Sequence, residues 1–262
     1  MRSVLTDEIL TEQKGHVLWV TFNRPQARNA MKRVMYDRLA EIGDEVNADD
    51  NIRVVVLTGA GDKAFVSGTD ISEFENFKKP EDSIKYEEQM NAVMDKLERV
   101  RVPMIAAVRG ACTGGGMSIA TMCDLRIATP DSRFGYPVAR TLGNCLSIEN
   151  YKRLVNQLGY TAVKQNVFTA KLLDAQRAYQ LGFLSEIVEP DKLMERATEL
   201  AETIAGNAPL TIRATKEALR RIMHDGADAE GQDLVLSCYM SQDFREGMTA
   251  FFEKRPANWT GK

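Results

Sequence analysis

A glycine-rich segment reads Arg109-Gly110-Ala111-Cys112-Thr113-Gly114-Gly115-Gly116-Met117-Ser118-Ile119-Ala120; it follows an apolar, strand-like segment at 104–108 and leads into a predicted helix. Consecutive glycines let a backbone approach a ligand without interference from Cβ atoms. The first N–H groups of a helix lack partners within it, and the helix dipole favours negative charge there. The stretch therefore predicts either a site for a phosphate or an oxyanion, or tight packing of a strand against a helix. It has neither the GKS/GKT of a P-loop nor the spacing of a dinucleotide fingerprint.

The surrounding pattern alternates strand-like and helix-like segments. Apolar, β-branched runs at 16–22, 53–58, 103–108 and 124–128 are mostly bounded by Gly, Pro or Asn, which is typical of strands. Helical periodicity follows the first run, at 30–46, and the second run, at 80–100. This alternation indicates an α/β core with parallel strand pairing.

The second half of the chain is almost wholly helical in pattern. We expect helices at 147–158, 161–168, 174–181, 191–206, 209–224 and 229–254, the last with a break near Ser241 and Asp243, and a short strand at 185–188. Asp174 is expected to cap one helix and Gly182 to end it. The change of pattern near residue 147 indicates a core with a helical extension, and not two independent modules.

A second glycine-containing stretch follows the strand at 53–58, and it reads Ala64-Phe65-Val66-Ser67-Gly68-Thr69-Asp70-Ile71. The two stretches together resemble the paired signatures of the crotonase family, the enoyl-CoA hydratase/isomerase superfamily. The resemblance covers essentially the whole chain, because further matching blocks occur in the family's order: Asn23-Arg24-Pro25-Gln26-Ala27-Arg28-Asn29-Ala30, Cys123-Asp124-Leu125-Arg126-Ile127-Ala128, Arg133-Phe134-Gly135 and Lys254-Arg255-Pro256.

The resemblance implies an α/β fold of the ClpP/crotonase type, a superhelix of ββα units with a C-terminal helical region. Residues 1–200 are then the core, and residues 201–262 are a helical region that serves in trimerisation or as a lid. Members of the family usually assemble into trimers or pairs of trimers, so a homotrimer or a dimer of trimers is expected.

The resemblance also implies a site for an acyl-CoA. By motif matching, the backbone N–H groups of Thr69 and Gly115 form an oxyanion hole that stabilises an enolate-like thioester oxygen. Coenzyme A is part of the substrate, and no separate cofactor is expected. The residues expected to hold its nucleotide and pantetheine are Arg24, Ala27, Ala30, Ser67, Gly68, Asp70 and Ile71. Phe251 and Lys254 resemble C-terminal residues that help to close the site, often from a neighbouring subunit.

The sequence departs from the family's hydratases at two positions. Those enzymes use two glutamates to add water to a double bond. The matching positions here are Ser118 and Val138. Serine is a poor base at neutral pH and valine transfers no proton, so hydration by two carboxylates at these positions is not supported.

Other side chains offer replacement chemistry, mostly in the loop 138–149, the expected wall of the acyl site. Arg140 could hold a second substrate carboxylate, or form a surface ion pair. The other candidates each have a structural alternative. Asn144 is then a turn residue, Cys145 a packed thiol and Glu149 a carboxylate at a helix end. Tyr136 is then an aromatic wall, and Glu73 and Glu75 lie on a solvated helix face.

These residues leave three functions open. The first is an acyl-CoA enzyme of the hydratase/isomerase family, a lyase or isomerase of the type found in fatty acid metabolism, with unusual acid–base groups. The second is a decarboxylase or hydrolase of a polar or carboxylated acyl-CoA, in which Arg140 binds the second carboxylate. The third is a catalytically idle acyl-CoA-binding protein.

Composition narrows the partners. The formal net charge is −3 and the sequence pI is about 5.6, which disfavours nucleic acid. The N-terminus has no secretory h-region, and the apolar runs are too short to span a membrane, so a cytoplasmic protein is expected. Two histidines without ligand spacing and four cysteines without a CxxC pair indicate no metal site.

Overall fold

The computed structural model describes residues 7–75 and 77–262. Residues 1–6, the first part of the N-terminus in which no secretory h-region is expected, lie outside these ranges. The main sheet has six strands in the order β1-β2-β3-β5-β7-β10, which is parallel except for the antiparallel pair β1 and β2. Its strands are β1 (Ile9–Lys14), β2 (Val17–Phe22), β3 (Val54–Gly59), β5 (Met104–Val108), β7 (Leu125–Ala128) and β10 (Glu186–Ile187).

A second sheet of short strands lies beside the first and has the order β4-β6-β8-β9. β4, β6 and β8 pair in parallel, and β9 is antiparallel to β8. Each of β3, β5 and β7 is followed by one of these short strands, so the chain steps from one sheet to the other in repeated units. The strands are β4 (Ala64–Val66), β6 (Ala111–Thr113), β8 (Arg133–Gly135) and β9 (Leu173–Asp174).

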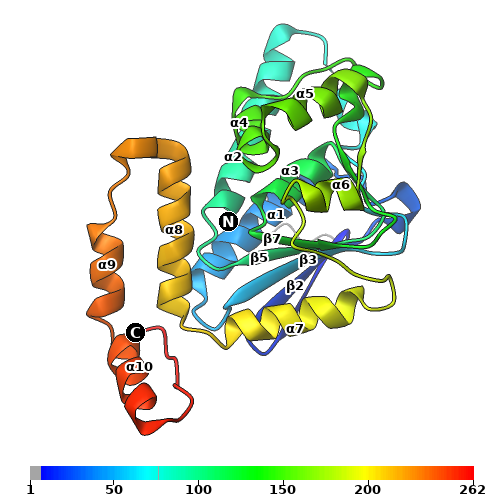
Figure 1. The fold of residues 1–262 in the computed structure, drawn as a ribbon. Helices are drawn as coiled ribbons and strands as arrows, with labels where there is room; N and C mark the ends of the chain where they lie inside the picture. Colours follow the sequence, from blue (N-terminus) through cyan, green and yellow to red (C-terminus); the bar gives the residue numbers. More distant parts are fainter. Residues whose placement is uncertain (1–6, 76) are drawn as a thin grey trace.

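Helices cover both faces of the main sheet (Figure 1). On one face, α7 (Leu193–Ala205) packs Leu193, Ala197, Ala201 and Ala205 on a cluster that includes Val54 and Val56 of β3. The intervening Val55 and Leu57 point to the larger core on the other face. Both faces of the strands are therefore buried, as their continuous apolar sequence predicts. The helices of the larger core are α1 (Arg33–Ala48), α2 (Pro80–Glu98), α3 (Gly115–Met122), α4 (Ile148–Leu158), α5 (Tyr160–Thr169) and α6 (Ala175–Gln180).

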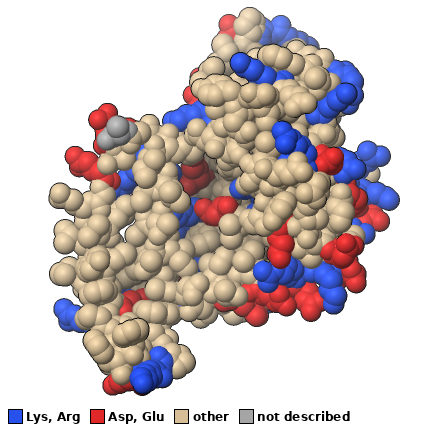
Figure 2. Space-filling view, in the orientation of Figure 1, with Lys and Arg blue, Asp and Glu red and all other residues tan. Residues whose placement is uncertain are grey.

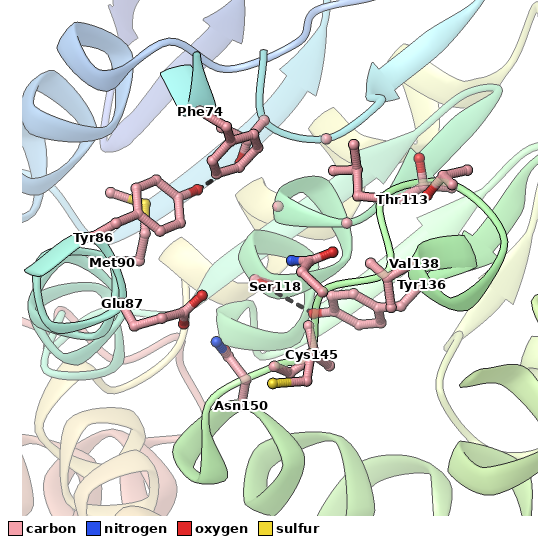
Figure 3. Close-up of a pocket in the computed structure, with 18 of the residues that line it drawn as sticks. Phe74, Tyr86, Glu87, Met90, Thr113, Ser118, Tyr136, Val138, Cys145 and Asn150 are labelled. Carbon is pink, nitrogen blue, oxygen red and sulfur yellow. Dashed lines mark hydrogen bonds between the residues drawn. The ribbon is translucent and has the colours of Figure 1, made fainter. Parts of the chain in front are cut away.

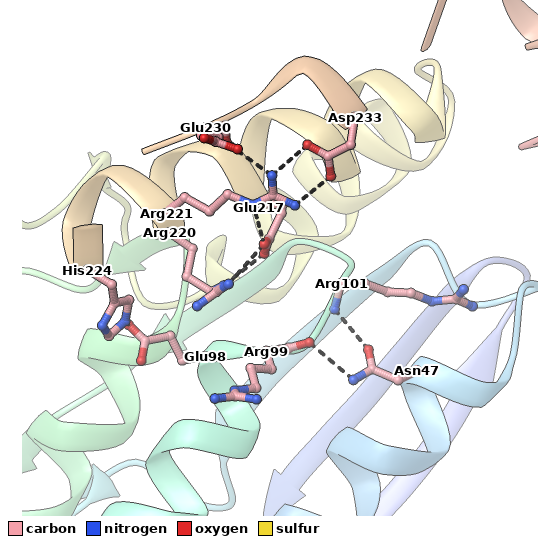
Figure 4. A network of polar contacts seen from close by, with 10 residues as sticks. All are labelled: Asn47, Glu98, Arg99, Arg101, Glu217, Arg220, Arg221, His224, Glu230 and Asp233. Atoms are coloured by element: carbon pink, nitrogen blue, oxygen red, sulfur yellow. Dashed lines mark hydrogen bonds and ion pairs between the residues drawn. The ribbon is translucent and has the colours of Figure 1, made fainter. Parts of the chain in front are cut away.

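The last three helices form an arm that projects from this body (Figure 1). They are α8 (Pro209–Asp225), α9 (Gln232–Tyr239) and α10 (Gln242–Glu253), and a 3₁₀ turn η4 (Gly226–Asp228) joins the first two. An ion pair holds α8 to the body, with the Lys216 Nζ 2.7 Å from the Asp124 Oδ2. On the same helix, the His224 Nε2 lies 3.2 Å from the Glu98 Oε1 (Figure 4).

Much of the arm is apolar and exposed. Figure 2 shows charged side chains interspersed over the body, whereas a large part of the arm carries no charge on the face in view. The exposed apolar residues of the arm include Leu219, Ile222, Val235, Leu236, Tyr239, Met240, Met248, Phe251 and Phe252. In the described part of the chain, no helix is both long and apolar enough to cross a bilayer.

The α/β class and parallel main sheet expected from the sequence are confirmed, and so is the helical second half. Asp174 caps α6 by accepting a hydrogen bond from the Arg177 N–H. The break expected near Ser241 and Asp243 is confirmed: α9 ends at Tyr239, and the Ser241 hydroxyl caps α10 by accepting a hydrogen bond from the Phe244 N–H. Residue 200, where the core was expected to end, lies within α7, whose buried residues continue to Ala205.

Candidate functional site

A cavity of about 240 Å³ lies where the two glycine-containing stretches meet (Figure 3). Its walls come from α1, α2, α3, the two turns that precede α2 and α3, and the segment 136–150. The lining residues used below are Tyr36, Thr69, Tyr86, Glu87, Gly115, Ser118, Tyr136, Val138, Asn144, Cys145 and Asn150.

The two stretches are in direct contact. The Thr113 hydroxyl donates a 2.8 Å hydrogen bond to the Ser67 carbonyl oxygen. A Cβ built on Gly114 would lie 3.4 Å from the Gly68 Cα, and one built on Gly115 would lie 3.3 Å from the Thr69 Oγ1. The turns that follow β4 and β6 therefore bring Thr69 and Gly115 to the same side of the cavity.

The backbone N–H groups of Thr69 and Gly115 have no acceptor within the described residues. Their neighbours are fixed, because Gly68 accepts a bond from the Met31 N–H, and the Asp70 N–H donates to the Met31 carbonyl, both at 2.8 Å. Gly115 is the first residue of α3, where a helix has N–H groups without partners. Two donors thus border one cavity.

Glycine is required at two positions of the triplet by close approach. A Cβ on Gly115 would collide with the Tyr36 hydroxyl, and a Cβ on Gly116 would collide with the Val66 carbonyl. Gly114 has a φ of 52°, in the region that glycine adopts at little cost. The triplet therefore allows both tight packing of the turns and exposure of the backbone, the two alternatives that the sequence left open.

Three hydroxyl groups form a chain along one wall. The Thr69 Oγ1 lies 2.9 Å from the Tyr36 Oη and 3.1 Å from the Tyr86 Oη. Burial raises the pKa of Tyr86 to about 12 and that of Tyr36 further above its ordinary value. Both phenols are therefore neutral near pH 7, and their hydroxyl groups are hydrogen-bonded to the Thr69 hydroxyl.

Ser118 and Tyr136 form a second pair, in which the hydroxyl oxygens are 2.8 Å apart. Both side chains are buried, and burial raises the pKa of Tyr136 far above its ordinary value. Val138 follows in the 3₁₀ turn η3 (Pro137–Ala139) and presents an apolar surface to the cavity. This part of the cavity is uncharged.

The carboxylate of Glu87 enters the cavity from α2, opposite Ser118 and Tyr136 (Figure 3). Among the lining residues, all within the described chain, Glu87 is the one acidic or basic residue. Neither a hydrogen bond nor an ion pair joins it to another described residue. Removal from water raises the pKa of this carboxyl group.

Glu87 was not predicted from the sequence as a site residue, although its spacing from apolar residues of the same helix pointed to the cavity. It lies three residues before Met90 and seven before Met94, two buried residues of α2. This spacing places Glu87 on the apolar face of the helix. A carboxylate on such a face is a better indicator of a site than one in a loop, because burial of a charge is costly without a function or a partner.

Of the other residues expected at the acyl end, some line the cavity and some do not. Asn144 and Cys145 line the cavity. Arg140 is exposed and is not among the lining residues. Glu149 is not among them either; it lies in the first turn of α4 beside a polar cleft and accepts a 3.4 Å hydrogen bond from Asn91. Glu73 accepts a bond from the Arg33 N–H, and Glu75 is exposed.

The residues expected to bind CoA also fall into two groups. Ser67, Gly68 and Ile71 line the cavity, and Ile71 is 63% exposed at its mouth. Arg24 is buried in the preceding loop, where it forms ion pairs with Glu8 at 3.2 Å and Asp70 at 3.0 Å and donates to the Ala30 carbonyl oxygen. Ala27 lies in the 3₁₀ turn η1 (Pro25–Ala27) of that loop.

Phe251 and Lys254 lie on the arm. Phe251 is 79% exposed on α10, and Lys254 caps the same helix in a left-handed conformation. Neither residue lines the cavity of its own chain.

The comparison with known proteins agrees with this architecture. The family model of enoyl-CoA hydratase/isomerase matches residues 12–262. A short-chain-enoyl-CoA hydratase of Clostridium acetobutylicum is 37% identical over 252 residues, which are 95% of this chain and 96% of that protein. A crotonyl-CoA hydratase of Syntrophomonas wolfei is 34% identical over 98% of this chain and 99% of its own.

Solved structures give the same result. An enoyl-CoA hydratase/carnithine racemase from Magnetospirillum magneticum superimposes with a TM-score of 0.91 at 30% identity, over 98% of this chain and 97% of that one. An enoyl-CoA hydratase from Bacillus anthracis gives 0.89 at 30% identity, over 98% and 100%. The fold is that of the crotonases, and the chain belongs to the enoyl-CoA hydratase/isomerase family.

Proposed function

We propose that this chain is an enzyme that binds an acyl-CoA with its thioester carbonyl oxygen between the N–H groups of Thr69 and Gly115. The supporting observation is that these two N–H groups, from two turns in contact, border one cavity and have no acceptor among the residues described. A thioester oxygen gains negative charge when the acyl group becomes enolate-like. Two fixed donors stabilise that charge, and each is worth about 10²–10³ in rate.

The dipole of α3 adds to this stabilisation. Gly115 is its first residue, so the Gly115 N–H lies at the positive end of the helix. The acyl end of the cavity has walls that include Met90, Met94, Val138, Leu142 and Leu146. Apolar walls around a few polar groups suit an acyl chain that is fixed at its thioester.

The remainder of the CoA is proposed to follow the loop 24–30 and the turn 67–71. Ion pairs between Arg24, Asp70 and Glu8 hold that loop against the turn, which orders the surface on which a nucleotide and pantetheine would rest. We place Phe251 and Lys254 at this site from a neighbouring copy in a homotrimer or dimer of trimers. The exposed apolar side chains of the arm support such an assembly.

The proposed reaction is of the lyase or isomerase class and proceeds through proton transfer next to the thioester. Coenzyme A as part of the substrate and the side chains of the chain supply all groups that this chemistry needs. Ser118 and Val138 provide no carboxylate, so the acid–base group belongs elsewhere in the cavity. The alternative of a carboxylated substrate held by Arg140 has less support, because that guanidinium lies outside the cavity lining.

Calorimetric titration with acetyl-CoA and crotonyl-CoA tests the proposal. We expect saturable binding of both by the wild-type protein, and much weaker crotonyl-CoA turnover or binding in Gly115→Ala, whose Cβ collides with the Tyr36 hydroxyl and shifts the donor. Gly231→Ala is the matched control, because a Cβ there meets no atom within 4 Å and its φ is −152°. A folded wild-type protein that binds neither thioester would contradict the proposal.

A further inference from the structure

One carboxylate stands alone in the cavity, and its position is unusual for a charged side chain. Glu87 is on the apolar face of α2, with the buried residues Met90 and Met94 on the same face. Its carboxylate has neither an ion pair nor a hydrogen bond to another residue in the described ranges. An unpaired, partly desolvated charge lowers stability, and such groups are concentrated at functional sites.

The neighbouring residue on α2 relates Glu87 to the two backbone donors. The Tyr86 hydroxyl lies 3.1 Å from the Thr69 Oγ1, so residue 86 touches the turn that supplies the first N–H group. Successive helical residues point about 100° apart. Glu87 therefore faces a different part of the cavity, toward Ser118, Tyr136 and Asn150 (Figure 3). A thioester held at Thr69 would have its acyl carbons in the space between these groups.

The residues opposite Glu87 offer no alternative group for acid–base chemistry. Tyr136 is a buried phenol whose hydroxyl is engaged with Ser118, and Val138 is apolar. Asn150 and Asn144 are amides, which neither gain nor lose a proton near neutral pH. Glu87 is the one carboxylic acid among the lining residues, and no other described residue forms an ion pair or a hydrogen bond with its side chain.

From this placement we infer that Glu87 exchanges a proton with the α-carbon of the bound acyl group; the inference rests on the proposed thioester site. The carboxylate oxygen forms an O–H bond as the α-C–H bond breaks. The electron pair of that C–H bond moves into the thioester and leaves the charge on the oxygen held by Thr69 and Gly115. Return of the proton to carbon, at the same or a conjugated position, restores the carboxylate, so atoms and electrons balance without another reactant.

Deuterium exchange measures this step directly. Butyryl-CoA and 3-butenoyl-CoA are incubated with the full chain in D₂O, and the incorporation of deuterium at the α-carbon is followed by NMR and mass spectrometry. We expect the wild-type protein to accelerate exchange, with the larger effect on 3-butenoyl-CoA, because its α-protons are more acidic. Glu87→Gln should slow exchange by about 10²–10⁴-fold, the usual contribution of a positioned acid–base group.

The adjacent residue supplies the control. Glu88→Gln makes the same chemical change one position along α2, at an exposed side chain outside the cavity lining, and should leave exchange unchanged. Calorimetric binding of butyryl-CoA should be within about threefold for wild type, Glu87→Gln and Glu88→Gln, because the amide has the shape of the carboxylate.

The two proposals fail in different ways. Absence of thioester binding by the wild-type protein would refute the thioester site itself. Binding without any wild-type exchange, or exchange that survives in Glu87→Gln, would leave the thioester site in place and overturn the role of Glu87.

Discussion

The Ser118 Oγ lies 2.8 Å from the Tyr136 Oη, and both side chains are buried beside the cavity. Ser118→Ala removes one partner and leaves the phenol without it. An unpaired buried hydroxyl costs about 1–3 kcal/mol, so we expect the free energy of unfolding to fall by that amount in urea titrations.

A double-mutant cycle separates this hydrogen bond from other effects. Tyr136→Phe removes the other hydroxyl, and the Ser118→Ala/Tyr136→Phe double variant leaves neither group unpaired. Its loss of stability should be clearly smaller than the sum for the two single variants. Strict additivity would show that the two hydroxyls do not stabilise each other.

Thr69→Ala should lower the stability of the folded protein but change the rate of α-proton exchange only slightly. The variant retains the backbone N–H that we assign to the thioester oxygen, but it removes the hydroxyl between the Tyr36 and Tyr86 hydroxyls. We expect a loss of about 1–3 kcal/mol in unfolding free energy. The rate of α-proton exchange should fall by less than about tenfold, against the 10²–10³ expected for loss of an oxyanion donor. If the exchange rate instead falls by 10²–10³ while the variant remains folded, the Thr69 hydroxyl, and not only its backbone N–H, contributes to the reaction.

The arm provides a test of pH-dependent stability. Hydrogen bonds from Arg220 and then Arg221 lower the pKa of Glu217 to about 2 (Figure 4). A lowered pKa stabilises the folded state above the unfolded value of about 4.5, and the contribution is lost as the pH falls toward about 2. The carboxylate is 33% exposed, so the effect should be about 1 kcal/mol or less.

The stability difference between wild type and Glu217→Gln should therefore shrink as the pH is lowered from about 6 to about 3. Glu189→Gln is the control, because Glu189 is exposed and forms no ion pair with a described residue. A difference that is constant across this range, in thermal unfolding of the two proteins, would argue against the ionised pair.

The main sheet and the helices could be predicted because their signals are long. Strands such as β3 are continuous apolar runs, and α2 has buried residues at the helical spacing of Met90, Val93, Met94 and Leu97. The second sheet could not be predicted in this way. β4, β6 and β8 have three residues each, and β6 reads Ala-Cys-Thr, which has no alternation long enough to indicate a strand. Contacts between distant segments, not local pattern, form this sheet.

The candidate site was predictable where backbone geometry is encoded by glycine. Gly114 to Gly116 and Gly68 indicated the turns that meet at the cavity. The loop 138–149 gave no such guide, since alternate residues of an irregular loop point in directions that sequence does not specify. Asn144 lines the cavity, whereas Arg140, four residues earlier, does not. Glu87 was missed because a glutamate on a helix is usually solvated.

The pH dependence of α-proton exchange follows from the environment of Glu87. The base must be ionised, and desolvation raises its pKa above that of an ordinary glutamate. Exchange should therefore decline as the pH falls, with a midpoint above the ordinary glutamate pKa of about 4.5. The other titratable groups that line the cavity are Tyr36, Tyr86, Tyr136 and Cys145. Burial raises the pKa of all three phenols, so they stay neutral across this range.

Cys145→Ser removes the remaining titratable group, and the decline of the exchange rate at low pH, the acid limb of the pH profile, should remain. Glu87→Asp retains a carboxylate on a shorter side chain, so it should keep an acid limb at a reduced rate, whereas Glu87→Gln should abolish the limb. Because a packing defect would lower the rate without removing the pH dependence, loss of the limb in the amide variant alone identifies the group that carries the proton. A limb that persists unchanged in Glu87→Gln would assign it to another residue.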